Sequence, residues 1–162
     1  MLYLFADDNK IYKVIKNPTS DRSDMQIDLD KLYDWSKLWL MKIHPDKLYG
    51  VEIGGWRENP QYDYTVGPMV VKHSTMEKDI GVEVDNKLKF SGHIDTITKK
   101  ANCKAGWLRR TFKFLTPTMF RPLYMAVVRS QLQHASSAWS PHQSQDIDKL
   151  ETVQIRATKM LP

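Results

Sequence analysis

The first sixteen residues consist of two apolar segments separated by a polar centre. Residues 1–5 (MLYLF) and residues 10–16 (KIYKVIK) are both rich in β-forming side chains, and residues 6–9 (ADDN) lie between them. Two such segments joined by a short stretch of Asp and Asn are typical of a β-hairpin. We therefore predict a hairpin over residues 1–6 and 10–16, with neighbouring carboxylates at its tip.

A stripe of helical spacing follows the hairpin. Its positions recur at steps of four, three, four and three residues: Met25, Leu29, Leu32, Ser36 and Trp39. This spacing predicts a helix over residues 22–41. We interpret the stripe, with Trp35 and Trp39 included, as a packing face and not as a site of chemistry.

Short strand-like segments fill most of the chain from there to residue 90. We predict a strand over residues 48–53, two strands within residues 62–72 about Gly67-Pro68, and a strand over residues 80–84. Together with the hairpin and the one helix, these segments indicate an α+β layer pattern.

Helical patterns replace the strands after a boundary near residues 88–92. Ser91 is placed to cap a helix that runs to about residue 114, and Thr116-Pro117 is a helix-start signal for a segment that runs to about residue 134. A last helix begins at Ser144. The fold class we predict is α+β over residues 1–90, followed by an all-α, three-helix part over residues 91–162.

Positive charge is concentrated in the first of these helices. Residues 94–113 hold six cations against one acid, Asp95, and six minus one equals the whole formal excess of +5. The six are Lys99, Lys100, Lys104, Arg109, Arg110 and Lys113. Such a cluster is either a solvated helix face or a contact surface for a polyanion, and its position within one helix makes the second interpretation testable.

Cysteine content and hydropathy narrow the class of protein. Cys103 is the only cysteine, so neither a disulfide framework nor a cysteine-based zinc site can form within the chain. No apolar run approaches the length that spans a membrane. We expect an intracellular protein, nuclear or cytoplasmic, that is not secreted and has no membrane partner.

The ordered set of motifs resembles the C-terminal part of the reverse transcriptase of a non-LTR (LINE, jockey-like) retrotransposon. No single motif is specific, but the pieces follow one another in the family's order across essentially the whole chain. They are residues 5–12 (FADDNKIY), 44–47 (HPDK), 77–82 (EKDIGV), 88–91 (LKFS), 139–141 (WSP) and 150–159 (LETVQIRATK).

The resemblance implies a piece of a right-hand polymerase that copies RNA into DNA. Residues 1–90 would be the end of the palm, and residues 91–162 the thumb and the segment after it. Asp7 and Asp8 would serve two-metal nucleotidyl transfer with Mg²⁺. Lys47 would lie near the phosphates of the incoming deoxynucleoside triphosphate and assist the leaving group, or it is a solvated lysine.

The family likeness also implies contacts with an RNA template and a DNA primer. Gly81 would support the primer end, where a glycine allows close approach of a backbone, or it occupies a simple bulge or turn. Trp107 and Phe112 are expected in the core, in preference to the alternative that they are base-stacking platforms. The residues expected to contact phosphates of the template–primer duplex are Lys99, Lys100, Lys104 and Arg110.

A complete polymerase needs parts that find no counterpart among these residues. The family's palm has another catalytic aspartate before the hairpin, and its fingers bind nucleotide and template. We therefore expect the isolated chain to be catalytically inactive, as a fragment of the parent polymerase. The alternatives are a non-catalytic nucleic-acid-binding module and a remnant without function.

Overall fold

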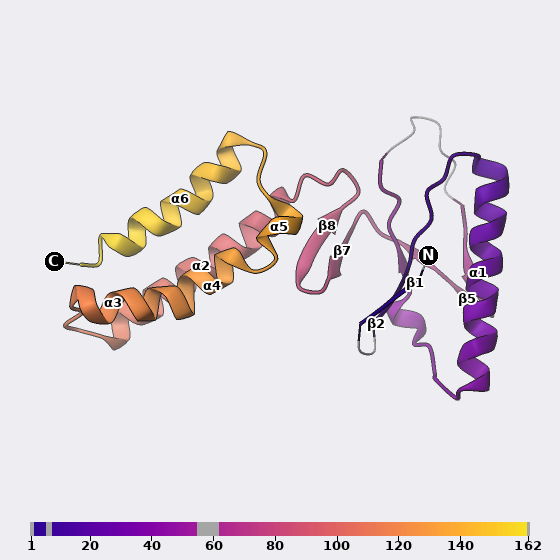
Figure 1. Cartoon of the computed structure of the whole chain (residues 1–162), viewed down its shortest axis with the longest axis horizontal. Helices are drawn as coiled ribbons and strands as arrows, with labels where there is room; N and C mark the ends of the chain where they lie inside the picture. Colours follow the sequence, from indigo (N-terminus) through magenta and orange to yellow (C-terminus); the bar gives the residue numbers. More distant parts are fainter. Residues whose placement is uncertain (1, 6–7, 55–61, 162) are drawn as a thin grey trace. The chain divides into compact units, whose positions relative to one another are not determined.

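The structure is a computed structural model that describes residues 2–5, 8–54 and 62–161. Contacts within the chain group these residues into two compact units. Unit 1 comprises Met1–Gly50 with Trp56–Ser74, and unit 2 comprises Val51–Gly55 with Thr75–Pro162. Their helices and strands are labelled in Figure 1. The combination of small sheets with several helices confirms the predicted α+β class.

Unit 1 begins with the predicted hairpin. Strand β1 (Leu2–Phe5) pairs antiparallel with β2 (Asp8–Ile11), with Phe5 opposite Asp8. The second strand therefore starts and ends earlier than residues 10–16, because this register leaves only two residues between the paired ends. Those two residues, Ala6 and Asp7, lie outside the described residues.

Helix α1 (Pro18–Leu38) confirms the predicted helix, with both ends shifted toward the N-terminus. It begins at a proline, whose fixed φ and missing N–H suit the first helical position. The carboxylate of Asp21 accepts hydrogen bonds from the backbone N–H groups of Lys16 and Asn17, both at 2.7 Å. These bonds draw the segment after β2 into the helix start and lower the pKa of Asp21.

Only some residues of the predicted packing stripe on α1 are buried. Leu29 is buried in a small core with Val66 and Val71, but Trp35 is 40% exposed and Trp39 is 64% exposed. The expectation that both tryptophans pack in a core is wrong. Because α1 ends at Leu38, Trp39 caps the helix and no longer extends its packed face.

Two pairs of short strands follow the 3₁₀ turn η1 (Pro45–Lys47) in unit 1. Strand β3 (Tyr49–Gly50) pairs parallel with β6 (Lys72–His73), and β4 (Thr65–Val66) pairs antiparallel with β5 (Met69–Val70). The β4–β5 turn contains Gly67 at φ +58°, where an added Cβ would lie 2.3 Å from Cζ of Tyr33. The turn predicted about Gly67-Pro68 is therefore confirmed, and it requires glycine.

Unit 2 opens with a second hairpin. Strand β7 (Met76–Asp79) pairs antiparallel with β8 (Val82–Asp85), and Ile80 and Gly81 join them with φ of 44° and 88°. Positive φ at both central residues is the pattern of a type I′ turn. The strand predicted over residues 80–84 therefore begins at Val82, and Gly81 occupies a turn, which was one of its two interpretations.

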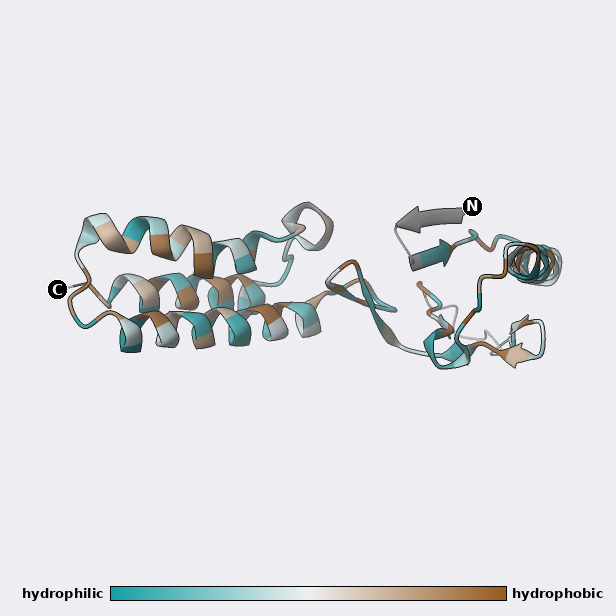
Figure 2. Cartoon of the chain, turned by 90° about the horizontal axis from the view of Figure 1, so that it is seen from below, coloured by the Kyte–Doolittle hydropathy of each residue, from teal (hydrophilic) through white to brown (hydrophobic). Residues whose placement is uncertain are grey.

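Two long helices and several short helical segments make up most of residues 91–158 of unit 2. They are α2 (Ser91–Thr111), α3 (Pro117–Leu123), the π-helical segment η2 (Tyr124–Arg129), α4 (Ser130–Gln133), the short α5 (Ser136–Trp139) and α6 (Ser144–Thr158). Figure 2 shows hydrophobic and hydrophilic positions alternating along them. Among the residues described, no helix combines the length and apolar character needed to cross a bilayer.

The starts and irregularities of these helices have local causes. Phe90, in the left-handed conformation, is the N-cap of α2, so the prediction that Ser91 caps this helix is wrong. Instead, Ser91 Oγ donates to Asp146 Oδ2 on α6 at 2.7 Å. Thr116 caps α3 as predicted, with its side chain accepting from Met119 N–H. Pro122 has no N–H to donate, and the turn that follows it is π-helical.

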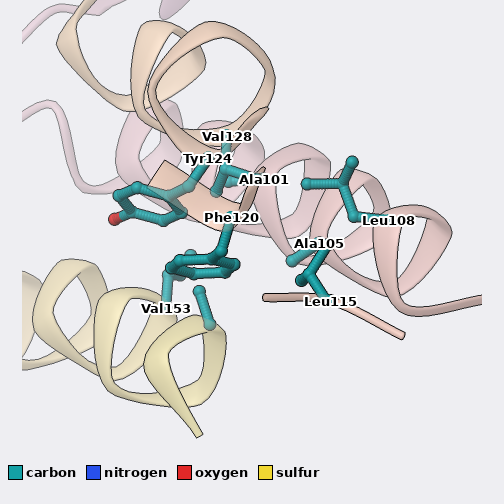
Figure 3. Packing of buried hydrophobic residues seen from close by; sticks show 9 residues of the cluster. Ala101, Ala105, Leu108, Leu115, Phe120, Tyr124, Val128 and Val153 are labelled. Carbon is teal, nitrogen blue, oxygen red and sulfur yellow. The ribbon is translucent and has the colours of Figure 1, made fainter. Parts of the chain in front are cut away.

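Two apolar clusters hold unit 2 together. The larger one joins α2, α3, η2 and α6 and is drawn in Figure 3: Ala101, Ala105, Leu108, Leu115, Phe120, Tyr124, Val128, Val153 and Ala157. Phe112 packs against it, as expected. The smaller cluster joins β8 to α2 and α5 through Val82, Ile94, Ile97 and Trp139. The β7–β8 hairpin thus belongs with the helices by its contacts, and the division of residues 1–90 and 91–162 into palm and thumb stays a prediction.

His93 on α2 is a buried titratable side chain of unit 2. Its ring is 2% exposed, lies edge-on to Trp139, and accepts a hydrogen bond at Nδ1 from Glu83 N–H at 3.2 Å. Burial lowers the pKa of His93, the Glu83 carboxylate opposes that shift, and His134 and Lys100 add to it.

We expect the free energy of unfolding to fall as the pH drops below about 6.5, the pKa of an unfolded histidine. The unfolded state then binds a proton that the folded state resists, so acid favours unfolding. Urea titrations at pH 7.5 and 5.5 check this, and His93→Gln should lose less stability on acidification than the wild type. His142→Gln is the matched control because His142 is exposed, and an equal pH effect in all three proteins would contradict the prediction.

Candidate nucleic-acid interface

The four predicted phosphate-contacting residues lie on the exposed side of α2. Lys99, Lys100, Lys104 and Arg110 are all exposed. The buried side of the same helix is formed by His93, Ile94, Ile97, Thr98, Ala101, Ala105 and Leu108. Successive residues of an α-helix are rotated by about 100°, which separates Lys99 and Arg110 from the buried row and places Lys104 at the edge of that row. The structure therefore brings the four cations together on one surface, which we call the basic face: Lys99, Lys100, Lys104, Trp107 and Arg110.

The basic face has the dimensions of a short stretch of nucleic acid. Lys99 and Arg110 are eleven residues apart, which corresponds to a rise of about 16 Å along the helix. Lys100 and Lys104 are one turn apart in an adjacent row. A rise of about 3.4 Å per nucleotide of one strand means that about five nucleotides match this length.

The positive charge of this face is not neutralised within the described residues. None of the four cations forms an ion pair there, and Lys104 Nζ donates to the neutral Gln131 Oε1 at 2.7 Å. Asp95, the one acid of the segment, is paired with Lys149 of α6 at 2.6 Å. The face thus keeps its full charge toward solvent, which is the arrangement that attracts a polyanion.

Trp107 is the residue of this face that sequence reasoning missed. Its side chain is 50% exposed, so its expected place in the core is wrong. Lys99, Cys103, Trp107 and Arg110 follow one another at steps of four, four and three residues, the spacing of one helix face. That spacing was available in the sequence and would have placed Trp107 among the cations.

A groove of about 400 Å³ between α2 and α6 is lined by both acidic and basic side chains, unlike the basic face. It is lined by Thr98, Asn102, Gln145, Asp148, Lys149, Thr152 and Arg156. Lys149 is held by Asp95 and by the buried Asp146, at 2.6 and 3.0 Å. Burial acts to raise the pKa of Asp146, but the hydrogen bonds from Ser91 and Lys149 outweigh it and lower that pKa. This ion-pair network joins the start of α2 to α6 and is structural.

The other predicted site residues belong to the two hairpins and to η1. Asp7 lies outside the described residues, and Asp8 is described only by its backbone, at the start of β2. Lys47 is exposed at the end of η1, beside Asp46, whose pKa is lowered by its hydrogen bond with Lys72. Gly81 lies in the β7–β8 turn, where an added Cβ would be 3.1 Å from His134 Nε2.

These residues do not by themselves form a two-metal centre. Carboxylate oxygens are the ligands that Mg²⁺ prefers, so the chemistry of Asp7 and Asp8 suits the ion. A two-ion site requires more ligands than two neighbouring carboxylates supply. The described residues contain no group of three or more His, Cys, Asp or Glu side chains placed to hold a metal. No reaction step through a metal follows from this chain alone.

Comparison with known proteins finds one informative likeness. The chain is 25% identical over 111 residues to the RNA-directed DNA polymerase from mobile element jockey of Drosophila melanogaster. The match covers 67% of this chain but 12% of that polymerase. No family model matches, and no solved structure matches. The likeness supports a reverse-transcriptase-like origin for the chain.

Proposed function

We propose that the chain is part of the RNA-directed DNA polymerase of a non-LTR (LINE, jockey-like) retrotransposon, comprising the end of the palm and the thumb. The likeness to the jockey polymerase supports this origin. The uncompensated charge of the basic face is the observation that carries the functional part of the proposal. A nucleic-acid duplex is the polyanion that such a polymerase must hold.

In this proposal the basic face binds the backbone of the RNA template–DNA primer duplex. Lysine and arginine side chains that contact phosphates supply affinity and position but read no sequence. The exposed cations of α2 extend over the length of about five nucleotides. The apolar core behind them, formed by Ala101, Ala105 and Leu108, keeps the helix in place while its other side is free.

Catalysis in this proposal belongs to the longer polymerase. Asp7 and Asp8 would contribute to Mg²⁺ binding only together with a carboxylate from elsewhere in that protein, and Lys47 would act at the phosphates of a deoxynucleoside triphosphate. The isolated 162-residue chain does not extend a primer. The protein works inside the cell, in the nucleus or the cytoplasm.

A non-catalytic nucleic-acid-binding module is the second candidate. The observation that favours it is that α2 and the helices that pack against it all belong to unit 2. The basic face therefore has its whole structural support within one unit. Binding through this face needs neither the metal-ligand hairpin nor unit 1. Both candidates bind nucleic acid through the same cations. They differ in whether the chain is part of a polymerase that carries out catalysis.

The shared part is tested by a salt titration of binding. We expect the purified chain to bind a fluorescent RNA–DNA hybrid with a dissociation constant of about 10⁻⁴ to 10⁻⁶ M at physiological salt, independent of sequence. The logarithm of the binding constant should fall linearly with the logarithm of salt concentration as counterions are released. Fluorescence anisotropy measures both quantities. Absence of binding, or binding unaffected by salt, would contradict the proposed function.

A further inference from the structure

Trp107 is an exposed aromatic ring in the middle of the basic face. Half of its side chain is accessible to solvent, although tryptophan is among the side chains that gain most from burial. Its ring makes no aromatic or cation–π contact with another described residue. The indole is therefore available to a partner that the positive charge around it attracts.

The surface beside the ring is open. The exposed Cys103 lies one turn before Trp107, and the half-buried Gly106 directly precedes it in the chain. An added Cβ at Gly106 would meet no atom within 4 Å, so no neighbour in the structure requires glycine there. Glycine destabilises a helix interior relative to alanine. Of the residues one turn away from Trp107, the exposed Cys103 has a small side chain, which leaves room for a flat group to approach the face of the indole.

Cations surround this open surface on both sides along the helix. Lys99, Lys100 and Lys104 precede Trp107, and Arg110 follows it by three residues. Proteins that bind single-stranded nucleic acid combine such a positive track for the backbone with aromatic rings on which bases stack. In an intact duplex the bases are stacked on one another, so only an unpaired base can offer its face to the indole.

Building on the proposed function, we propose that Trp107 is a stacking platform for an unpaired base, so that the basic face takes nucleic acid with a single-stranded segment. Phosphates contact the cations before and after the ring, and one base lies on the indole. Charge complementarity selects the polyanion, and the ring selects the unpaired base within it.

The test compares two oligonucleotides of equal length and charge. One is a twelve-residue oligothymidine, and the other is the same backbone with abasic sites, which keeps the phosphates and removes the bases. One stacked base corresponds to about five- to 160-fold in affinity. The wild-type chain should bind the oligothymidine more tightly by that factor. Trp107→Ala should lose most of this preference, and Trp107→Phe should keep part of it.

Controls separate stacking from charge and from folding. The salt slope should be the same in wild type, Trp107→Ala and Trp107→Phe, because the ring carries no charge. Trp39 is 64% exposed and belongs to unit 1. Trp39→Ala therefore removes an exposed indole elsewhere in the chain and should leave the affinities for both oligonucleotides unchanged. Circular dichroism and a thermal melt of each variant establish that it is folded.

Each outcome points to one conclusion. If Trp107→Ala keeps the preference for bases, stacking by Trp107 is wrong while the proposed function stands. If Trp107→Ala weakens binding to both oligonucleotides equally, Trp107 only supports the helix and the inference is also wrong. If the wild-type chain binds neither oligonucleotide nor the RNA–DNA hybrid, the proposed function itself fails.

Discussion

Replacing Lys99, Lys100 and Lys104 together with glutamine should flatten the salt dependence of nucleic-acid binding by about 2.7 in the log–log slope. Each phosphate contact contributes about 0.9 to that slope on a duplex, and the three substitutions remove three contacts. The remaining affinity for an RNA–DNA hybrid should be low enough to approach the detection limit at physiological salt. Anisotropy titrations between 50 and 200 mM salt, concentrations over which such contacts weaken binding strongly, measure the slope.

The matched control removes the same charge from other exposed positions. Lys42→Gln, Lys78→Gln and Lys159→Gln, combined in one protein, lower the formal net charge from +5 to +2, as the first triple variant does. All three of these lysines are exposed and none lies on α2. The control should keep most of the wild-type slope. Equal slopes in the two triple variants would show that net charge, and not the basic face, governs binding.

The helices of this chain could be predicted from sequence because their apolar positions repeat over many turns. Leu29 belongs to the stripe predicted on α1 and is buried, and Val153 and Ala157 on α6, four residues apart on one face, are buried as well. The ends were less predictable, because they depend on single residues with special backbone conformations. Phe90 caps α2 in the left-handed conformation, which is uncommon for a bulky side chain and has no signature in the sequence.

The burial of aromatic residues was the least predictable part of the fold. Trp139 is buried against His93 and donates from its indole nitrogen to the His134 carbonyl oxygen, whereas Trp39 and Trp107 are exposed. Hydrophobicity alone does not distinguish these three residues. For Trp107 the deciding information is its position relative to the buried row of α2, and that comparison needs only helical spacing.

Candidate site residues were predictable where one element carries them all. Lys99, Lys100, Lys104 and Arg110 share α2, so the periodicity of one helix limits them to an arc of about 140° around its axis, and all four are exposed. A metal centre instead needs side chains from several elements, and no pattern within the chain determines how Asp7 and Lys47 approach one another. The hydrogen bond from Ser91 to the buried Asp146 was missed for the same reason, since fifty-five residues separate them.

The largest effect is expected at the hairpin of β1 and β2, in a polymerase that contains this chain together with the fingers and the remaining palm. Asp7→Asn should reduce primer extension on an RNA template to background, since an amide lacks the negative charge that holds a divalent cation. Incorporation of labelled nucleotide with Mg²⁺ measures this. The isolated 162-residue chain should show no incorporation in the same assay.

Asn9→Ala provides the comparison within the same hairpin, because Asn9 is exposed on β2 and carries no charge. That variant should retain synthesis. Binding of the RNA–DNA hybrid should be unchanged in both variants, since the basic face belongs to unit 2 and the hairpin to unit 1. Synthesis by Asp7→Asn at the wild-type rate would mean that Asp7 is not a metal ligand. Incorporation by the isolated chain would mean that catalysis needs no further carboxylate, and the assignment of this chain to part of a larger active site would be wrong.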